Sequence, residues 1–160
     1  HAGILWSSIG WATPASMGTC LADPSRRTVI ITGDGSHQLT ANELGNYYRH
    51  GAKPIVFELN NSGFAIERVI EEYPDYEYND IADWEYHKLP AALGCKDWFT
   101  ARVTTLGELD AARATASEAD TGCYIEIVID KHDYPAAAIA MPTRWEEFYG
   151  IAQQPGQPPE

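Results

Sequence analysis

Apolar residues of this chain gather in four short runs, and each run predicts a β-strand. The runs are rich in Val, Ile and aromatic residues and cover residues 27–32, 54–59, 98–104 and 123–130. In the first run the apolar residues do not alternate with polar ones, which is typical of a strand buried on both faces. The third run alternates and is also predicted to be a strand.

Between these runs the apolar residues recur at the spacing of a helix. Leu39, Leu44 and Tyr47 belong to one such pattern, which we expect to stop at Gly51. One predicted helix starts near Thr13, and the pattern that includes Leu39 predicts another that extends to residue 50. Further helices are predicted at residues 86–93, 106–119 and 142–152. Strands that alternate with helices at this spacing predict an α/β fold with a parallel sheet flanked by helices.

The chain length of 160 residues predicts one domain, which we assign to residues 1–150. Residues 151–160 are rich in Pro and Gln and are predicted to form a disordered tail. The first residue is His rather than Met, so we expect the chain to be a fragment of a longer one.

Charge and cysteine content exclude several classes of function. The chain carries 11 Lys and Arg against 23 Asp and Glu, a formal net charge of −12. Such a surface repels nucleic-acid phosphates and anionic membranes, so we expect neither as a partner. Three scattered cysteines, Cys20, Cys95 and Cys123, form no C-x-x-C pair and predict reduced thiols in a cytoplasmic protein.

Two polar loops follow the first two predicted strands, at Gly33–Ser36 and Asn60–Gly63. Ligands of parallel sheets bind beyond the carboxyl ends of the strands, so both loops are candidates for one site. An Asp-Gly pair is also common in hairpin turns. Here helical periodicity follows it, which favours a phosphate cradle in which Gly35 permits close approach of the backbone and Ser36 offers an N–H group.

Three oxygen ligands from these loops would suit Mg²⁺. Asp34 offers a carboxylate, Asn61 an amide oxygen and Gly63 a backbone carbonyl. Mg²⁺ prefers octahedral oxygen coordination that phosphate oxygens and water complete. A single carboxylate is sufficient if a diphosphate supplies the remaining negative charge, and the metal then explains how an acidic protein binds an anion.

The sequence Gly33-Asp34-Gly35-Ser36, with Asn61 following Asp34 by 27 residues, resembles the thiamine diphosphate signature. Three further segments resemble pyruvate and indolepyruvate decarboxylases, and the resemblance covers about residues 5–130. They are SIGWATPA at 8–15, NNSGFAIE at 60–67 and NDIADW at 79–84. The chain is therefore similar to the C-terminal diphosphate-binding domain of thiamine diphosphate-dependent 2-oxo acid decarboxylases of the pyruvate, indolepyruvate and phenylpyruvate group.

The resemblance implies a role for each matching residue. Mg²⁺ would be held by Asp34, Asn61 and the Gly63 carbonyl, and the diphosphate by the loop of Gly33, Gly35 and Ser36 together with the Asn61 region. Four more residues would contact the cofactor rings. The Ser7 carbonyl would accept a hydrogen bond from the 4′-amino group, and Ile9 would support the cofactor in its bent conformation. The other two, Phe64 and Ile66, would line the ring pocket.

Glu67 matches the active-site glutamate of the decarboxylase branch. A carboxyl group beside a departing carboxylate has to be protonated to avoid repulsion, and burial near an apolar pocket raises the pKa of a glutamate. The alternative is a solvated glutamate on a helix surface beside Arg68.

The resemblance implies non-oxidative decarboxylation of a 2-oxo acid to an aldehyde. The alternatives are a related carboligase and a non-catalytic cofactor-binding or structural module. In the family, the glutamate that activates the cofactor lies on the pyrimidine-binding domain of a second subunit. We therefore expect a homodimer or homotetramer, and no activity from this chain alone. The sequence leaves aromatic, indolic and aliphatic 2-oxo acids equally open.

Features outside these motifs have simpler interpretations. His37 is expected to occupy a first helix turn, while His50, His87 and His132 are expected on the surface. Residues 71–86 are rich in Tyr and carboxylates and are predicted to form a solvated, partly mobile lid or a contact with a neighbouring subunit.

Overall fold

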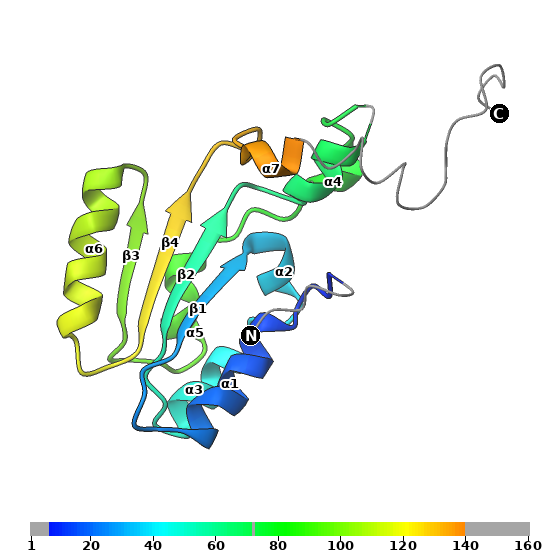
Figure 1. Ribbon diagram of the computed structural model, residues 1–160. Helices are drawn as coiled ribbons and strands as arrows, with labels where there is room; N and C mark the ends of the chain where they lie inside the picture. The colour runs from blue at the N-terminus through cyan, green and yellow to red at the C-terminus, as the bar shows by residue number, and fades with distance from the viewer. Residues whose placement is uncertain (1–6, 72, 140–160) are drawn as a thin grey trace, which may run out of the picture.

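A computed structural model describes residues 7–71 and 73–139 of the chain. Its centre is a four-stranded sheet in which all neighbouring strands are parallel, as predicted. The order across the sheet is β1 (Val29–Gly33), β2 (Ile55–Asn60), β4 (Cys123–Val128) and β3 (Phe99–Val103), shown in Figure 1. The helix predicted at 142–152 and the tail at 151–160 lie outside the described residues.

Helices cover both faces of this sheet (Figure 1). They are α1 (Ala12–Ala22), α2 (Asp34–Gln38), α3 (Glu43–Arg49), α4 (Ala65–Ile70), α5 (Leu89–Ala92), α6 (Leu106–Glu118) and α7 (Ala136–Ile139). Two short 3₁₀ turns are η1 (Glu77–Asn79) and η2 (Tyr86–Lys88). None of the helices in the described ranges has the length and apolar character that a membrane span needs.

The helix predicted to extend to residue 50 is two helices, α2 and α3, so this part of the prediction was wrong. Tight turns separate them, because the Thr40 N–H donates to the His37 carbonyl and the Glu43 N–H donates to the Thr40 carbonyl. The break allows the Thr40 side chain to donate to the Gly10 carbonyl at 3.0 Å. Apolar spacing alone did not reveal it, because Leu44 and Tyr47 both lie in α3 and are buried at helical spacing, while Leu39 at the break is exposed.

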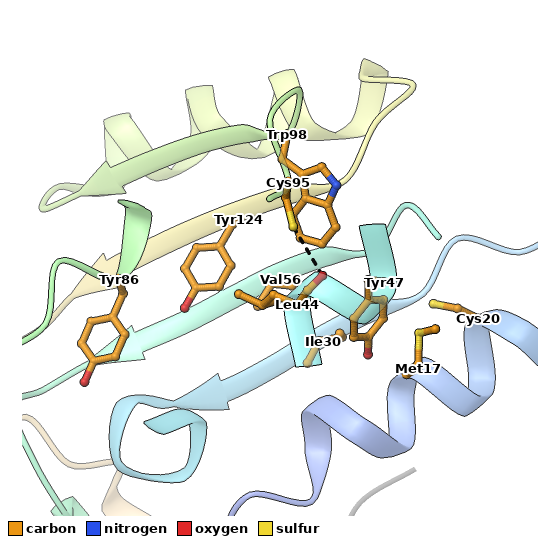
Figure 2. Close-up of a cluster of buried hydrophobic side chains, with 10 residues drawn as sticks. All are labelled: Met17, Cys20, Ile30, Leu44, Tyr47, Val56, Tyr86, Cys95, Trp98 and Tyr124. Atoms are coloured by element: carbon orange, nitrogen blue, oxygen red, sulfur yellow. Dashed lines mark hydrogen bonds between the residues drawn. The ribbon is translucent and has the colours of Figure 1, made fainter. Parts of the chain in front are cut away.

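Alternate residues of the strands build two separate cores. On one face, β2, β3 and β4 pack against α6, where Ala112 and Ala116 are buried. On the other face, α1 and α3 cover a larger cluster (Figure 2). Its members are Met17, Cys20, Ile30, Leu44, Tyr47, Val56, Tyr86, Cys95, Trp98 and Tyr124. All three cysteines are free and buried, as predicted.

A row of polar side chains lies on the second face. Parallel register places Thr32, Glu58 and Glu126 side by side on β1, β2 and β4, and all three are buried. Glu126 accepts hydrogen bonds from Asn60 Nδ2 at 2.9 Å and from the backbone N–H of His87 at 3.1 Å, and its Oε2 lies 2.6 Å from His87 Nδ1. His87 is therefore half-buried over the sheet and not the surface residue we predicted, because the buried carboxylate of Glu126 requires polar partners.

Glu58 differs from Glu126 in its surroundings. Its side chain is fully buried, and neither carboxyl oxygen has a hydrogen-bond partner among the described residues. Burial, with smaller contributions from the carboxylates of Asp34 and Glu126, raises the pKa of Glu58 from 4.5 to about 9. The side chain is therefore a neutral carboxylic acid at pH 7, in the middle of the sheet.

Glu58→Gln should change how stability depends on pH. The folded state holds a proton that the unfolded chain releases above pH 4.5, so the stability of the parent chain falls as pH rises from 4.5 to about 9. The limiting slope for one proton is about 1.4 kcal/mol per pH unit. Gln does not ionise, so the variant should gain stability relative to the parent chain across this range.

Urea unfolding at pH 5, 6.5 and 8 measures this difference. Glu118→Gln, an exposed position on α6, is the matched control and should follow the pH profile of the parent chain. Parallel profiles for Glu58→Gln and the parent chain would show that Glu58 is ionised in the folded state.

Candidate functional site

The two predicted loops lie side by side at the carboxyl edge of the sheet. Gly33 ends β1 and pairs in register with Leu59 of β2, so the residues that follow each strand emerge together. Figure 1 shows α2 and α4 just beyond the arrowheads of β1 and β2. Asp34 is the first residue of α2, and Asn61 follows the last residue of β2 directly.

The Asp34 carboxylate holds the two loops together. Its Oδ2 accepts the backbone N–H groups of Asn61 at 3.1 Å and Gly63 at 3.0 Å, and its Oδ1 accepts the N–H of Gly35 at 2.7 Å. The side chain is almost completely buried. Burial raises the pKa of Asp34, and these backbone N–H groups oppose the rise. A cation beside the carboxylate would favour its ionised form.

Three acceptor oxygens converge here, and one of them belongs to the Asp34 carboxylate itself. In one orientation of the Asn61 amide, its oxygen lies 3.2 Å from Asp34 Oδ1 and 2.8 Å from the Gly63 carbonyl oxygen. In the opposite orientation the amide nitrogen takes that place and donates to both oxygens. Neighbouring ligands of octahedral Mg²⁺, at 2.0–2.1 Å from the metal, are about 3 Å apart. The residues present therefore fit a magnesium ion.

The chemistry of these donors is that of a hard cation. They are one carboxylate, one amide and one carbonyl oxygen, the ligand types that Mg²⁺ takes in proteins. Across residues 7–71 and 73–139, no group of three or more His, Cys, Asp or Glu side chains is placed to hold a metal. A site of the zinc or transition-metal type is therefore absent from this part of the chain.

Arg68 fixes the second loop, and sequence reasoning missed it. Its guanidinium is buried and donates to the Ser62 carbonyl at 2.9 Å, to the Asn79 carbonyl at 3.3 Å and to Asp80 Oδ1 at 2.6 Å. Gly63 lies directly against Asn79 and Arg68, so a Cβ atom at this position would clash with both. The sequence predicts no role for Arg68, because no spacing shows which charged residue of a short helix points inward.

The segment predicted to form a lid has two parts in the structure. Tyr73, Tyr76 and Tyr78 are exposed and pack on one another, with the rings of Tyr76 and Tyr78 stacked 5.1 Å apart. Asn79, in contrast, is buried, and its carbonyl accepts the Phe64 N–H at 2.9 Å. This end of the segment therefore supports the loop that holds Asn61.

The remaining predicted contacts of the first loop are also close together. A Cβ atom on Gly35 would lie 2.5 Å and 2.7 Å from ring carbons of Phe64, so only glycine fits beneath that ring. The Ser36 hydroxyl accepts the Gly10 N–H at 2.9 Å and thereby ties the segment of Ser7 and Ile9 to α2. Ser7 adopts a positive φ of 48°.

Glu67 and two apolar residues of the predicted site are exposed. Glu67 lies in the first turn of α4 on the surface, so the described residues do not provide the buried environment expected for it. Ile66, beside it, is 43% exposed, and Ile9 is 53% exposed. A second surface would have to cover these side chains before Glu67 lies in an apolar pocket.

Comparison with known proteins agrees with this geometry. Residues 2–127 match the family described as thiamine pyrophosphate enzyme, C-terminal TPP binding domain. Curated alpha-keto-acid decarboxylases of Mycobacterium leprae (strain TN) and Mycobacterium avium (strain 104) are each 41% identical, over 152 and 140 residues. These alignments cover 94% and 86% of this chain.

The same alignments cover 26% and 24% of the two relatives, so the chain spans about a quarter of their length. The family match includes both loops and all the strands except the last residue of β4. The resemblance seen in the sequence is thereby confirmed at the level of the family. The chain belongs to the thiamine pyrophosphate enzymes and matches their C-terminal TPP binding domain.

Proposed function

We propose that this chain supplies the diphosphate- and Mg²⁺-binding half of an active site that decarboxylates a 2-oxo acid to an aldehyde without oxidation. The observation that carries the proposal is the convergence of three acceptor oxygens, from Asp34, Asn61 and Gly63, at the carboxyl edge of the sheet. The name of the relatives, alpha-keto-acid decarboxylase, supports the reaction class.

In this proposal both loops hold the metal, and the first loop also binds the diphosphate. Asp34, Asn61 and the Gly63 carbonyl hold Mg²⁺, and the backbone of Gly33, Gly35 and Ser36 meets the diphosphate. Asp34 reaches the metal in a fixed orientation, because backbone N–H groups of both loops already bind its carboxylate. When bound, thiamine diphosphate supplies the thiazolium that accepts the electron pair released as CO₂ leaves.

Four residues at the edge of the loops contact the rings. The Ser7 carbonyl accepts a hydrogen bond from the amino group of the pyrimidine, and Ile9 supports the cofactor from below. Phe64 and Ile66 line the pocket. Support for this set comes from the contacts that link them, Phe64 over Gly35 and Gly10 on Ser36.

Glu67 is proposed to hold and transfer the proton at the reacting carbon. On the open surface a carboxyl group is surrounded by water, whereas an apolar cover favours its neutral form. Four apolar side chains are exposed at this edge of the sheet: Ile9, Trp11, Leu39 and Ile66. We propose that the pyrimidine-binding domain of a second subunit covers them in a cytoplasmic homodimer or homotetramer.

The exposed position of Glu67 also favours a second candidate function. As described, the chain has the features of a cofactor-holding module whose catalytic acid lacks an enclosed pocket. The two candidates differ in whether Glu67 affects turnover once the complete enzyme is assembled.

The purified chain should bind thiamine diphosphate only when Mg²⁺ is present and should release no CO₂. Its Glu67 is uncovered, and no second surface encloses the cofactor rings. Calorimetry with and without EDTA measures binding, and a coupled assay with pyruvate, phenylpyruvate, indolepyruvate and a branched aliphatic 2-oxo acid measures turnover. Turnover by the chain alone would contradict the two-subunit site, and binding that is equal in EDTA would contradict the metal.

Asp34→Ala should abolish Mg²⁺-dependent cofactor binding, because it removes the only carboxylate among the three ligands and the acceptor that joins the two loops. Asn61→Ala should weaken binding by roughly 10-fold or more, since a neutral ligand is lost. Calorimetry with thiamine diphosphate and Mg²⁺ compares the variants with Asp110→Ala, an exposed carboxylate on α6. An affinity unchanged in both site variants would exclude the proposed metal ligands.

Glu67→Gln in the complete enzyme should slow turnover by about 10²–10⁴-fold, the usual contribution of a positioned acid or base. Cofactor affinity should change little, because the metal ligands are elsewhere. Glu118→Gln, an exposed position on α6, is the control and should keep the parent rate. A rate for Glu67→Gln within about twofold of the parent, the range of surface substitutions, would favour the module without a catalytic acid.

A further inference from the structure

We propose that the opposite edge of the sheet binds a compact anion of two or more charges, a phosphate group or a dicarboxylate. This amino edge lies where the strands begin, at the tails of the arrows in Figure 1. The loops that enter β1, β2 and β4 enclose a hollow of about 450 Å³ there. We call it the amino-edge hollow; Arg26, Arg27, His50, Lys53 and Asp120 are its charged or titratable lining residues. The proposal is independent of the function assigned to the carboxyl edge.

The charge of this hollow is opposite to that of the whole chain. The chain has a net charge of −12 and contains 11 Lys and Arg. Three of these cations, Arg26, Arg27 and Lys53, line the hollow against one carboxylate, Asp120. A second carboxylate, Asp23, interacts with Arg26 from beside the hollow, so the local charge is +1. A cationic recess on an acidic surface is the place where a small anion experiences attraction and not repulsion.

Arg27 provides a positive charge whose position is fixed by backbone carbonyls. Its Nη1 donates to the carbonyls of Ala116 at 2.8 Å and Ala119 at 2.7 Å, and its Nη2 donates to that of Thr121 at 2.6 Å. In the part of the chain that the structure describes, no acidic side chain forms an ion pair with it. The carbonyls hold the guanidinium in place, and Asp120 interacts with its charge without forming an ion pair.

Helix ends at this edge do not cancel the attraction. The C-termini of α1, α3 and α6 carry partial negative charge that would repel an anion. Their carbonyls are already engaged, because Arg27 binds the end of α6 and the N–H groups of Gly51 and Ala52 bind the carbonyls of Tyr48 and Tyr47 at the end of α3. At the end of α1, the Asp23 N–H binds the Thr19 carbonyl at 3.2 Å.

Arg26 and Lys53 are the side chains able to contact the ligand directly. Arg26 lines both the amino-edge hollow and a second hollow of about 410 Å³ beside it, and within residues 7–71 and 73–139 its guanidinium forms no hydrogen bond or ion pair. Lys53 Nζ lies 2.8 Å from Asp120, whose side chain is 95% exposed. Exposed pairs of this kind contribute little free energy, so a divalent anion can take the place of Asp120.

Size and charge together define the ligand class. A volume of 450 Å³ lies within the range of small-molecule sites. Two flexible cations on opposite loops match the separated oxygens of one phosphate or of two carboxylates, whereas a single carboxylate would satisfy only one of them. The structure therefore favours a dianion over a monoanion such as acetate.

The test is a nuclear magnetic resonance titration of the ¹⁵N-labelled chain with inorganic phosphate, and separately with succinate and acetate. EDTA is present throughout, so that Mg²⁺ does not load the carboxyl edge, and ionic strength is held constant with NaCl. Saturating shifts are expected for the amides of Thr28, Gly51 and Lys53 with at least one dianion, and weaker ones with acetate. The amides of Gly35 and Gly63 report on the carboxyl edge.

Three variants separate a specific site from a general field. Arg26→Gln and Lys53→Gln should each weaken dianion binding by about fivefold, the effect of about 1 kcal/mol for one charge contact near a surface. Arg49→Gln removes the same charge from the end of α3, outside the hollow, and should weaken it less than twofold. Equal losses in all three variants, shifts confined to Gly35 and Gly63, or no saturation with either dianion would each overturn the proposal.

Discussion

The Asp34 carboxylate is the interaction on which the site depends. It emerges from β1, and it accepts backbone N–H groups from the loop that follows β2. These bonds hold the two loops together, and the Asn61 side-chain amide lies 3.2 Å from Oδ1 and 2.8 Å from the Gly63 carbonyl oxygen. Burial penalises the charge of the Asp34 carboxylate, and the backbone N–H groups offset part of that penalty. A cation beside it would offset more, so the residue that joins the loop pair is also the anionic ligand of the proposed metal site.

The site at the carboxyl edge could be predicted because it depends only on the pairing of two neighbouring strands. Neighbouring parallel strands end at the same edge of the sheet. Asp34 and Asn61, which follow β1 and β2, therefore had to be close once these strands paired. The strand positions followed from runs of apolar residues, because a parallel strand buried on both faces is recognised by such a run alone. The family resemblance added the roles of Ser7 and Ile9, which no periodicity could supply.

The residues that sequence reasoning missed are those whose environment depends on the whole fold. Arg68, Glu58 and His87 are charged or titratable and would usually be exposed, yet two are fully buried and the third is half-buried. Two of them are placed by partners on other segments, Arg68 by the carbonyl of Asn79 and His87 by Glu126. Glu58 has no hydrogen-bond partner among the described residues and is buried by its position on β2, between β1 and β4. Glu67 shows the reverse, since its resemblance predicts a pocket that the described part of the chain does not enclose.

The two edges of the sheet differ in charge, and this difference follows from how each edge is filled. At the carboxyl edge, Asp34 is buried near Glu58 and Glu126, so carboxyl groups crowd one end of a narrow layer. Proton uptake by Glu58 relieves part of that repulsion in the absence of metal, and a cation at Asp34 would relieve more of it. At the amino edge, helix carbonyls require donors, and Arg27 supplies them together with a positive charge that forms no ion pair among the described residues. The cation site proposed at one edge and the anion site proposed at the other therefore rest on one requirement, the need to satisfy buried polar groups at both ends of a parallel sheet.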